Sequence, residues 1–419
     1  MTWYKNLGII ITPIIVSSFY FPVSINVLPG LNTKMALALV GCLIVAFQMG
    51  KRSLPTVDRQ LFVISMWALS VSFITFVSMT YNETADNTYL TYIISMYVWL
   101  VAAYALVAFI RWVHGKYTLK LISNYLIAVC VGQCALALAI DQFKPLKIFV
   151  SKYIIDTSWL ESVDRLYGIG AELDTAGVRF SVAIVLLVYL LKNASKYVLE
   201  KYVPVYLAAF LVLVVVGNMI ARTTSVGVVV GMLYLIYIFV NGRVGIIEID
   251  GYRHSHHHQA CQPPPRFLQR RSAFEGFFNL FEKGEWYISS NETLKGMYVF
   301  PESLKTWIIG DGYIVNPKFD PYYTGEVFTG YYKNTDVGYL RFIFYFGVTG
   351  LLLFAAFILQ VGRSCIQKFP QHGQLVFLLI VVNFIVWFKV STDIFLAFAL
   401  LLFLDEENEE QMQAQLRCE

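Results

Sequence analysis

Charged residues are scarce in this chain. Only 14% of its 419 residues are charged, while 57% are hydrophobic. Soluble domains have about 25% charged and about 45 to 50% apolar residues, so the composition excludes an ordinary soluble protein and indicates a polytopic membrane protein. The net charge of +4 is small, and the basic residues lie in short loops between apolar stretches, a pattern that sets membrane orientation. We therefore expect no nucleic-acid partner.

Cysteine and histidine are also few, and neither predicts a metal site. The six cysteines show no disulfide or zinc spacing. Cys130 and Cys134 lie four apart on one helical face, a spacing open to a soft metal but typical of packed thiols. The histidines at His254 and His256 to His258 could bind a transition metal by composition, but no carboxylate or cysteine pattern accompanies them. We expect no metal and no cofactor.

Long apolar runs are what the sequence has in abundance. A helix needs about 20 residues to cross the hydrocarbon core, and the first run, from Leu7 to Ile25, lacks a signal-peptide cleavage site. We predict an all-α polytopic integral membrane protein with about 11 transmembrane helices. The expected spans are 7–27, 35–49, 60–79, 89–110, 120–140, 179–191, two within 203–240, 338–359, 374–388 and 391–404.

Basic residues fix the expected orientation. They gather in the connections 51–59 and 111–120 and are absent from the connection around Glu83 and Asp86, which places the N-terminus in the cytoplasm. Two outer loops follow, the second long and partly helical. The expected divisions are a helix bundle at 1–140, a first periplasmic loop at 141–178, central spans at 179–243, a large periplasmic loop at 244–337, C-terminal spans at 338–404 and a solvated acidic tail at 405–419.

The run from Val203 to Val240 contains one charge, Arg222. A single helix of this length, at about 1.5 Å per residue, would far exceed a core of about 30 Å. We predict two short helices that turn at Arg222 on the outer side. The Gly227-x-x-x-Gly231 pattern in the second is expected to serve helix packing.

The segment from Tyr252 to Arg266 breaks the pattern. Its histidines and its prolines at 263 to 265 cannot form a lipid-exposed helix, yet one crossing is missing between Arg243 and the second loop. Three explanations compete: 203–240 is one oversized broken span, the segment lies in a protein-lined cavity, or an original hydrophobic span has been disrupted.

The stretch from Lys305 to Gly350 is the candidate site, where a polar surface meets the membrane. Its Gly310-Asp311-Gly312 turn allows a tight bend that exposes a carboxylate, and many tyrosines follow. They are suited to stacking on sugars or to an interfacial belt. Asp336 and Arg341 then lead into an apolar helix, whose N-cap Asp336 could provide. Upstream, four charges crowd the entrance to the span expected at 179–191: Arg165, Glu172, Asp174 and Arg179.

These motifs, in this order, resemble a known group. An Arg-Thr turn between apolar helices, a long outer loop, and GDGY followed by TDVGYLRFIFYFGVTG are similar to the Wzy-type O-antigen polymerases of the O-antigen ligase and polymerase superfamily. The resemblance covers most of 160–360 and is strongest from Asn291 to Gly350. It implies a bacterial inner-membrane glycosyltransferase that joins undecaprenyl-pyrophosphate-linked repeat units, with lipid-linked donor and acceptor, no nucleotide and a chain-length regulator as a further partner. The segment at 252–266 departs from the family, which generally has a hydrophobic span there.

The resemblance also implies roles for individual residues. Arg222 matches the family's outward-facing arginine, and Arg165, Gly168 and Gly170 match its first outer loop. The positions that match the second loop are Asp311, Asp336, Tyr339 and Arg341. Guanidinium groups suit a departing pyrophosphate, and a carboxylate can accept the proton of the attacking hydroxyl. The expected catalytic residues are Asp336 and Asp311, and the expected pyrophosphate- and sugar-binding residues are Arg222, Arg165, Arg179, Arg341, Tyr339 and Tyr313.

Two alternatives stay open. An O-antigen ligase of the same superfamily relies on a histidine in the second outer loop, and this sequence has none between Phe267 and Gly350. A transporter or flippase would place charges or broken helices at mid-membrane, whereas these charges gather at the outer ends of the expected helices. The sequence therefore favours a polymerase.

Overall fold

The computed structural model describes residues 2–24, 30–50, 59–154, 165–171, 173–193, 196–241, 279, 284–285, 287–317, 321–325 and 330–405. Every regular element within these ranges is a helix, and β-structure is limited to isolated bridges, as the sequence predicts for an all-α fold. Among the described helices, seven are long and apolar enough to cross a membrane, and three shorter apolar helices accompany them. These are the helices of a multi-pass membrane protein.

The helices have the following bounds in chain order. The N-terminal part contains α1 (Thr2–Tyr20), α2 (Thr33–Gly50), α3 (Arg59–Asn82), α4 (Tyr92–His114), α5 (Leu119–Gln142) and α6 (Lys144–Tyr153). The central part contains α8 (Leu173–Asn193), α9 (Lys196–Ile220) and α10 (Thr224–Val240). The C-terminal part contains α12 (Ser289–Gly296), α13 (Leu304–Ile308), η3 (Tyr332–Asn334), α14 (Gly338–Lys368), η4 (Pro370–His372), α15 (Gly373–Val386) and α16 (Phe395–Leu401).

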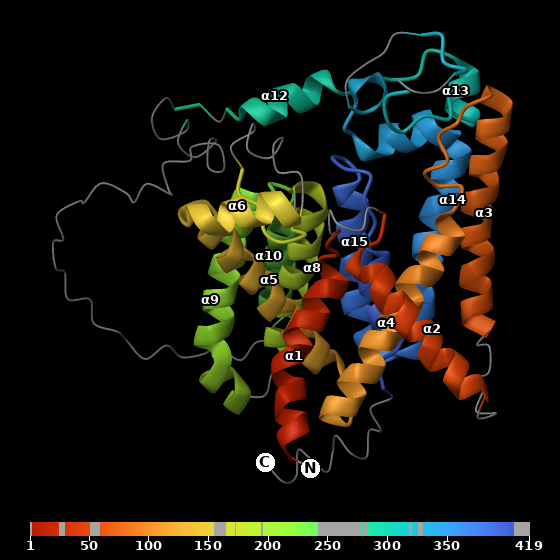
Figure 1. Ribbon diagram of the computed structural model, residues 1–419. Helices are drawn as coiled ribbons and strands as arrows, with labels where there is room; N and C mark the ends of the chain where they lie inside the picture. The colour runs from red at the N-terminus through yellow and green to blue at the C-terminus, as the bar shows by residue number, and fades with distance from the viewer. Residues whose placement is uncertain are drawn as a thin grey trace.

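One end of the bundle carries the polar segments, and we call it the loop end. There α3 meets the candidate loop, because the Asn82 side chain donates to the Gly310 carbonyl at 3.1 Å. There also α1 meets α8, through a 3.0 Å hydrogen bond from the Tyr20 hydroxyl to the Arg179 carbonyl. Figure 1 shows α12 and α13 across this end and the beginning of α1 at the opposite end. The described part of the second loop therefore lies on the same side as the connection between α3 and α4.

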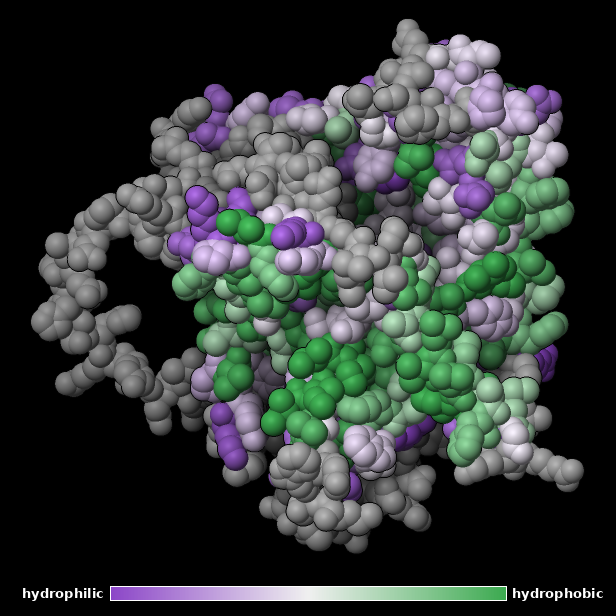
Figure 2. Space-filling model, in the orientation of Figure 1, coloured by the Kyte–Doolittle hydropathy of each residue, from purple (hydrophilic) through white to green (hydrophobic). Residues whose placement is uncertain are grey.

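The lipid-facing surface is apolar. Large hydrophobic side chains such as Leu43, Phe73 and Phe239 are more than 60% exposed, which would be costly in water and is expected in contact with acyl chains. Figure 2 shows hydrophobic residues as a broad band across the middle of the face in view, with hydrophilic residues mainly above and below it. The interior is packed with large side chains such as Phe180, Phe354 and Trp387.

Several expected boundaries are wrong. α1 ends at Tyr20 and not near residue 27, and α8 begins at Leu173, so Arg179 lies inside this helix and not at its entrance. The first loop contains a helix, α6. Asp405 was expected in a solvated tail, but its carboxylate binds the Arg111 guanidinium at 2.5 Å and accepts a 2.6 Å hydrogen bond from the Tyr117 N–H.

The region from 203 to 240 is divided as predicted. α9 and α10 are joined at Ala221 to Thr223, so Arg222 lies in the turn. The glycines of α10 serve packing, because a Cβ on Gly227 would lie 2.3 Å from Ser181 Cα in α8. The connection from α10 to the second loop, which contains 252–266 and its histidines, lies outside the described residues.

Candidate functional site

α14 is broken at the loop end, and the candidate loop docks into the break. Gly347 has φ 71° and ψ −179°, a conformation open essentially to glycine alone. The break releases the carbonyls of Phe344 and Tyr345 from regular helical bonding, and the loop satisfies them. The Asp311 N–H donates to the Phe344 carbonyl at 2.5 Å, and the Gly312 N–H donates to the Tyr345 carbonyl at 3.1 Å. The span expected at 338–359 lies within α14, which is long and apolar enough to cross a membrane, but the sequence did not predict the break at Phe346 and Gly347.

The turn itself needs its glycines. Gly310 and Gly312 have φ of +84° and +76°, and a Cβ on Gly310 would lie 2.6 Å from the Phe346 nitrogen. The loop is also bound to the α3–α4 connection, where the Ile314 N–H donates to the Asp86 carboxylate at 2.9 Å. The glycine-flanked turn predicted from the sequence therefore serves to bury its backbone against α14, and not to expose a carboxylate.

Asp311 is held by three donors. The Lys305 ammonium lies 2.7 Å from its carboxylate, the Thr306 hydroxyl donates at 2.7 Å, and the Tyr332 hydroxyl lies at 3.4 Å. Lys305 also donates to Asn82 at 2.6 Å. Burial, together with the negative charge of Asp311, raises the pKa of the Tyr332 hydroxyl. Asp311 thus ties the loop together, and little of its side chain faces solvent.

The tyrosines of the candidate loop form a small core. Tyr313 and Tyr332 are buried, with ring centroids 5.4 Å apart, and Tyr323 packs edge-on against Tyr313. Tyr339 donates its hydroxyl to the Phe384 carbonyl at 2.9 Å and packs against the Trp387 ring. These positions give Tyr313 and Tyr339 packing roles. Tyr322, at 61% exposed, is the tyrosine of this loop most open to a ligand among those described.

Asp336 and Arg341 face each other at the start of α14. The Asp336 carboxylate lies 3.8 Å from Arg341 Nη1, and the guanidinium covers the ring of Tyr331 at 3.5 Å from its centroid. The N-cap of α14 is Val337, whose N–H donates a hydrogen bond to the Thr335 hydroxyl oxygen at 3.3 Å. Asp336, which the sequence offered as a possible N-cap, therefore does not cap α14.

The segments that carry Arg165, Arg179 and Arg222 also meet at the loop end. The Arg179 guanidinium lies 5.4 Å from the Phe21 ring centroid, and the Phe21 carbonyl packs against Gly170, which follows Arg165 in the first loop. Arg179 is also next to the Arg222 turn, because the Ser181 hydroxyl donates to the Thr223 carbonyl at 3.1 Å. The first loop is fixed by Gln133, whose side chain donates to the Ile169 carbonyl and accepts from its N–H, both at 2.9 Å.

The connection between α15 and α16, residues 387–394, lies between the Asp336–Arg341 pair and Arg179. The sequence did not predict that it belongs to the site. It packs against the start of α14, where the Tyr339 N–H donates to the Trp387 carbonyl at 2.9 Å. It also carries Asp393, which lines a small cavity together with Arg179. The sequence places Asp393 in a span expected at 391–404. A single carboxylate inside an apolar run was the signal that could have found it.

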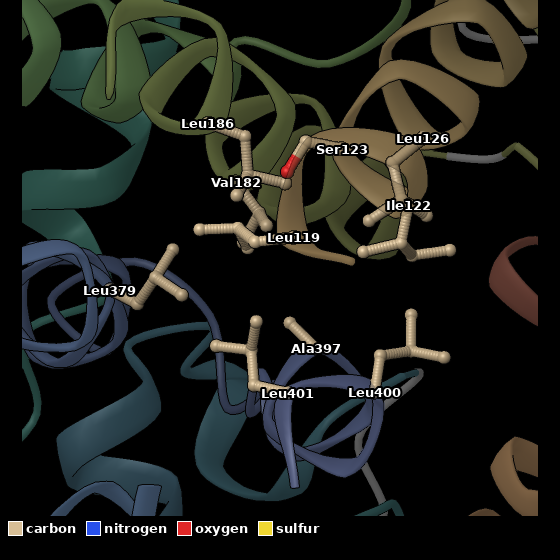
Figure 3. Close-up of a pocket in the computed structure, with 10 residues that line it drawn as sticks. All are labelled: Leu119, Ile122, Ser123, Leu126, Val182, Leu186, Leu379, Ala397, Leu400 and Leu401. Atoms are coloured by element: carbon tan, nitrogen blue, oxygen red, sulfur yellow. The ribbon is translucent and has the colours of Figure 1, made fainter. Parts of the chain in front are cut away.

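Below this region the bundle is apolar. Figure 3 shows a cavity between α5, α8, α15 and α16 whose labelled side chains are hydrophobic except for Ser123. Val182 and Ala397 line both this cavity and that of Asp393. Val182 and Ala397 therefore separate the polar groups of the site from a cavity that is lined mainly by apolar side chains.

The described residues contain no group of three or more histidine, cysteine or acidic side chains placed to bind a metal ion. Cys130 and Cys134 are buried free thiols in α5. His114 and His372 each bond a tyrosine hydroxyl, at 2.9 Å and 3.2 Å, at the end of the bundle opposite the loop end. The chain matches no protein-family model, no curated protein and no solved structure.

Proposed function

We propose that the protein polymerises undecaprenyl-pyrophosphate-linked oligosaccharide repeat units at the periplasmic face of a bacterial inner membrane. The observation that supports the proposal is that segments carrying four arginines lie at the loop end of a bundle with an apolar lipid-facing surface: Arg165, Arg179, Arg222 and Arg341. Polar loops cover this end, and lipid-facing helices lie beneath it. A lipid-linked substrate requires both surfaces, because its polyprenyl tail stays in the membrane while its sugars stay in water.

The reaction breaks the bond between the anomeric carbon of the growing glycan and its pyrophosphate. Negative charge develops on the phosphate oxygens as this bond breaks, and arginine binds such oxygens with two parallel hydrogen bonds. Fixed guanidinium groups therefore stabilise the transition state more than the ground state. A carboxylate at the loop end accepts the proton of the attacking hydroxyl of the next lipid-linked repeat, and the sequence offers Asp336 and Asp311 for this role.

The binding of Asp311 by Lys305 and Thr306 favours Asp336 of these two carboxylates. Asp311 accepts from an ammonium and a hydroxyl, each at 2.7 Å, so its negative charge is already compensated within the loop. Asp336 lies 3.8 Å from Arg341 and beside the connection that carries Asp393. No nucleotide or metal takes part in this proposal, and the further partner it allows is a chain-length regulator.

The break in α14 is a feature that secondary transporters share, since discontinuous helices there expose backbone groups to ions. In this protein the released carbonyls bond the Asp311 and Gly312 N–H groups and the Ser78 hydroxyl, the last at 2.7 Å to Tyr345. They are thus occupied by the chain itself. A ligase is disfavoured by the absence of histidine between Phe267 and Gly350.

Deletion of the gene in its own host, with examination of the lipopolysaccharide on gels, tests the proposal. A polymerase deletion leaves single repeats on the lipid A core, and the ladder returns when the gene is supplied on a plasmid. A core without any repeat would instead indicate a ligase. An unchanged ladder and unchanged surface polysaccharide would refute the proposal.

A further inference from the structure

Asp393 is surrounded by groups from several helices. Its carboxylate accepts a 2.8 Å hydrogen bond from the Phe395 N–H at the start of α16 and a 3.3 Å hydrogen bond from the Tyr92 hydroxyl of α4. Lys34 of α2 and Arg179 of α8 both act on it as positive charges. Residues distant in sequence thus converge on a single carboxylate, in a bundle whose other buried surfaces are mostly apolar.

The cavity beside Asp393 lies between α1, α8, α16 and the connection 387–394. Arg179, Thr392 and Asp393 contribute to its lining together with Val182 and Ala397, and most of the lining surface is apolar. It has room for about one water molecule or one hydroxyl group. A hydroxyl group therefore fits this space, whereas a sugar ring does not.

We infer that Asp393 is the catalytic carboxylate that accepts the proton of the acceptor sugar hydroxyl. This inference rests on the proposed polymerase function. As the hydroxyl oxygen forms a bond to the anomeric carbon of the donor glycan, the bond from that carbon to the pyrophosphate oxygen breaks. The electron pair of the broken bond leaves with the pyrophosphate, beside Arg179, and the hydroxyl proton passes to an Asp393 oxygen. This assignment gives Asp393 the role of proton acceptor in place of Asp336 and Asp311, and Asp336 positions Arg341.

The surroundings of Asp393 set its basicity. Burial raises the pKa of the Asp393 carboxyl, and the hydrogen bonds and the positive charges act in the opposite direction. A carboxylate that is harder to keep ionised is a stronger base near neutral pH. Its charged, titratable and hydrogen-bonding neighbours are Tyr20 of α1, Lys34 of α2, Tyr89 in the connection before α4, Tyr92 of α4, Arg179 of α8 and the Phe395 N–H of α16.

The test uses the whole protein in lipid nanodiscs and the lipid-linked repeat extracted from the deletion strain. Elongation is followed on gels against time, substrate concentration and pH. Asp393→Asn should lower kcat at least about a hundredfold, the smaller end of what general base catalysis contributes, with KM changed less than threefold. Asp141→Asn, at the loop end of α5 and outside the site, is the matched control and should elongate like wild type.

Asp393→Glu keeps a carboxylate and separates catalysis from folding. It should retain part of the activity and move the acid limb of the pH profile, since the base must be deprotonated and its longer side chain changes its surroundings. If Asp393→Asn elongates within threefold of wild type, or if Asp393→Glu leaves the acid limb in place, the inference is overturned while the polymerase proposal stands. If wild-type protein does not elongate the repeat, the polymerase proposal itself fails.

Discussion

The break in α14 predicts a large effect for the substitution Gly347→Ala. A Cβ at this position would lie 2.1 Å from the Ile308 carbonyl oxygen, and the φ of +71° disfavours any side chain. The neighbouring atom is backbone in α13, so it can move only if the docked loop moves with it. Such movement withdraws the N–H groups of Asp311 and Gly312 from their carbonyl partners in α14.

The magnitude follows from these two terms. Backbone strain of this kind costs about 2 kcal/mol. The Phe344 carbonyl left without a partner costs about 1 to 2 kcal/mol, while the Tyr345 carbonyl keeps its hydrogen bond from the Ser78 hydroxyl. We therefore expect a loss of roughly 3 to 4 kcal/mol in the free energy of unfolding. In a chain of this size, each kcal/mol lost lowers the midpoint of thermal unfolding by a few degrees or less. The midpoint should therefore be lower by about 10 °C or somewhat less.

Thermal unfolding in detergent measures this change, with a dye that fluoresces on reaction with thiols. The buried thiols of Cys130, Cys134 and Cys365 report unfolding, while Cys42 is exposed and reacts at the start. Gly132→Ala is the control, because its Cβ would meet no atom within 4 Å and alanine in a helix should stabilise by about 0.5 to 1 kcal/mol. A midpoint for Gly347→Ala within 2 °C of wild type would refute this account of the break.

Three further outcomes are expected. Arg222→Lys should stop chain growth at normal protein levels, with single-repeat lipopolysaccharide, because an ammonium cannot form the planar two-bond contact with pyrophosphate; a full ladder would make Arg222 structural. Phosphatase fusions should be active after Lys333 and inactive after Lys116, and the reverse result would place the site in the cytoplasm. Replacement of all six histidines should preserve the ladder, and loss of the ladder at normal protein levels would indicate a metal or ligase-like mechanism.

The sequence predicted those features that depend on length and composition. The turn at Arg222 followed from the excess length of an apolar run over the bilayer, and the structure places it between α9 and α10. The polar loop was predicted from its glycines and tyrosines, and its described part lies at the loop end with Arg341 at the start of α14. These are local properties, which a single sequence contains in full.

The features that the sequence did not predict depend on distant contacts. Gly347 lies in an apolar run where glycine is typical of helix packing, and only its Ile308 neighbour shows why a Cβ is excluded. Tyr313 and Tyr339 were expected at a sugar-binding surface; Tyr313 is buried against η3, and the partly buried Tyr339 contacts α15. Asp393 was assigned to a span because the partners that surround it are far away in sequence.

The position of Asp393 also bears on which function the fold can support. A charged group at mid-membrane with a polar path on either side would favour transport. Here the cavity of Asp393 is followed by an apolar one that shares Val182 and Ala397 with it, so the described helices provide no polar path beneath the site. A carboxylate near the loop end with apolar side chains beneath it suits chemistry on a lipid-linked substrate, where the reacting oxygen must leave water before it loses its proton.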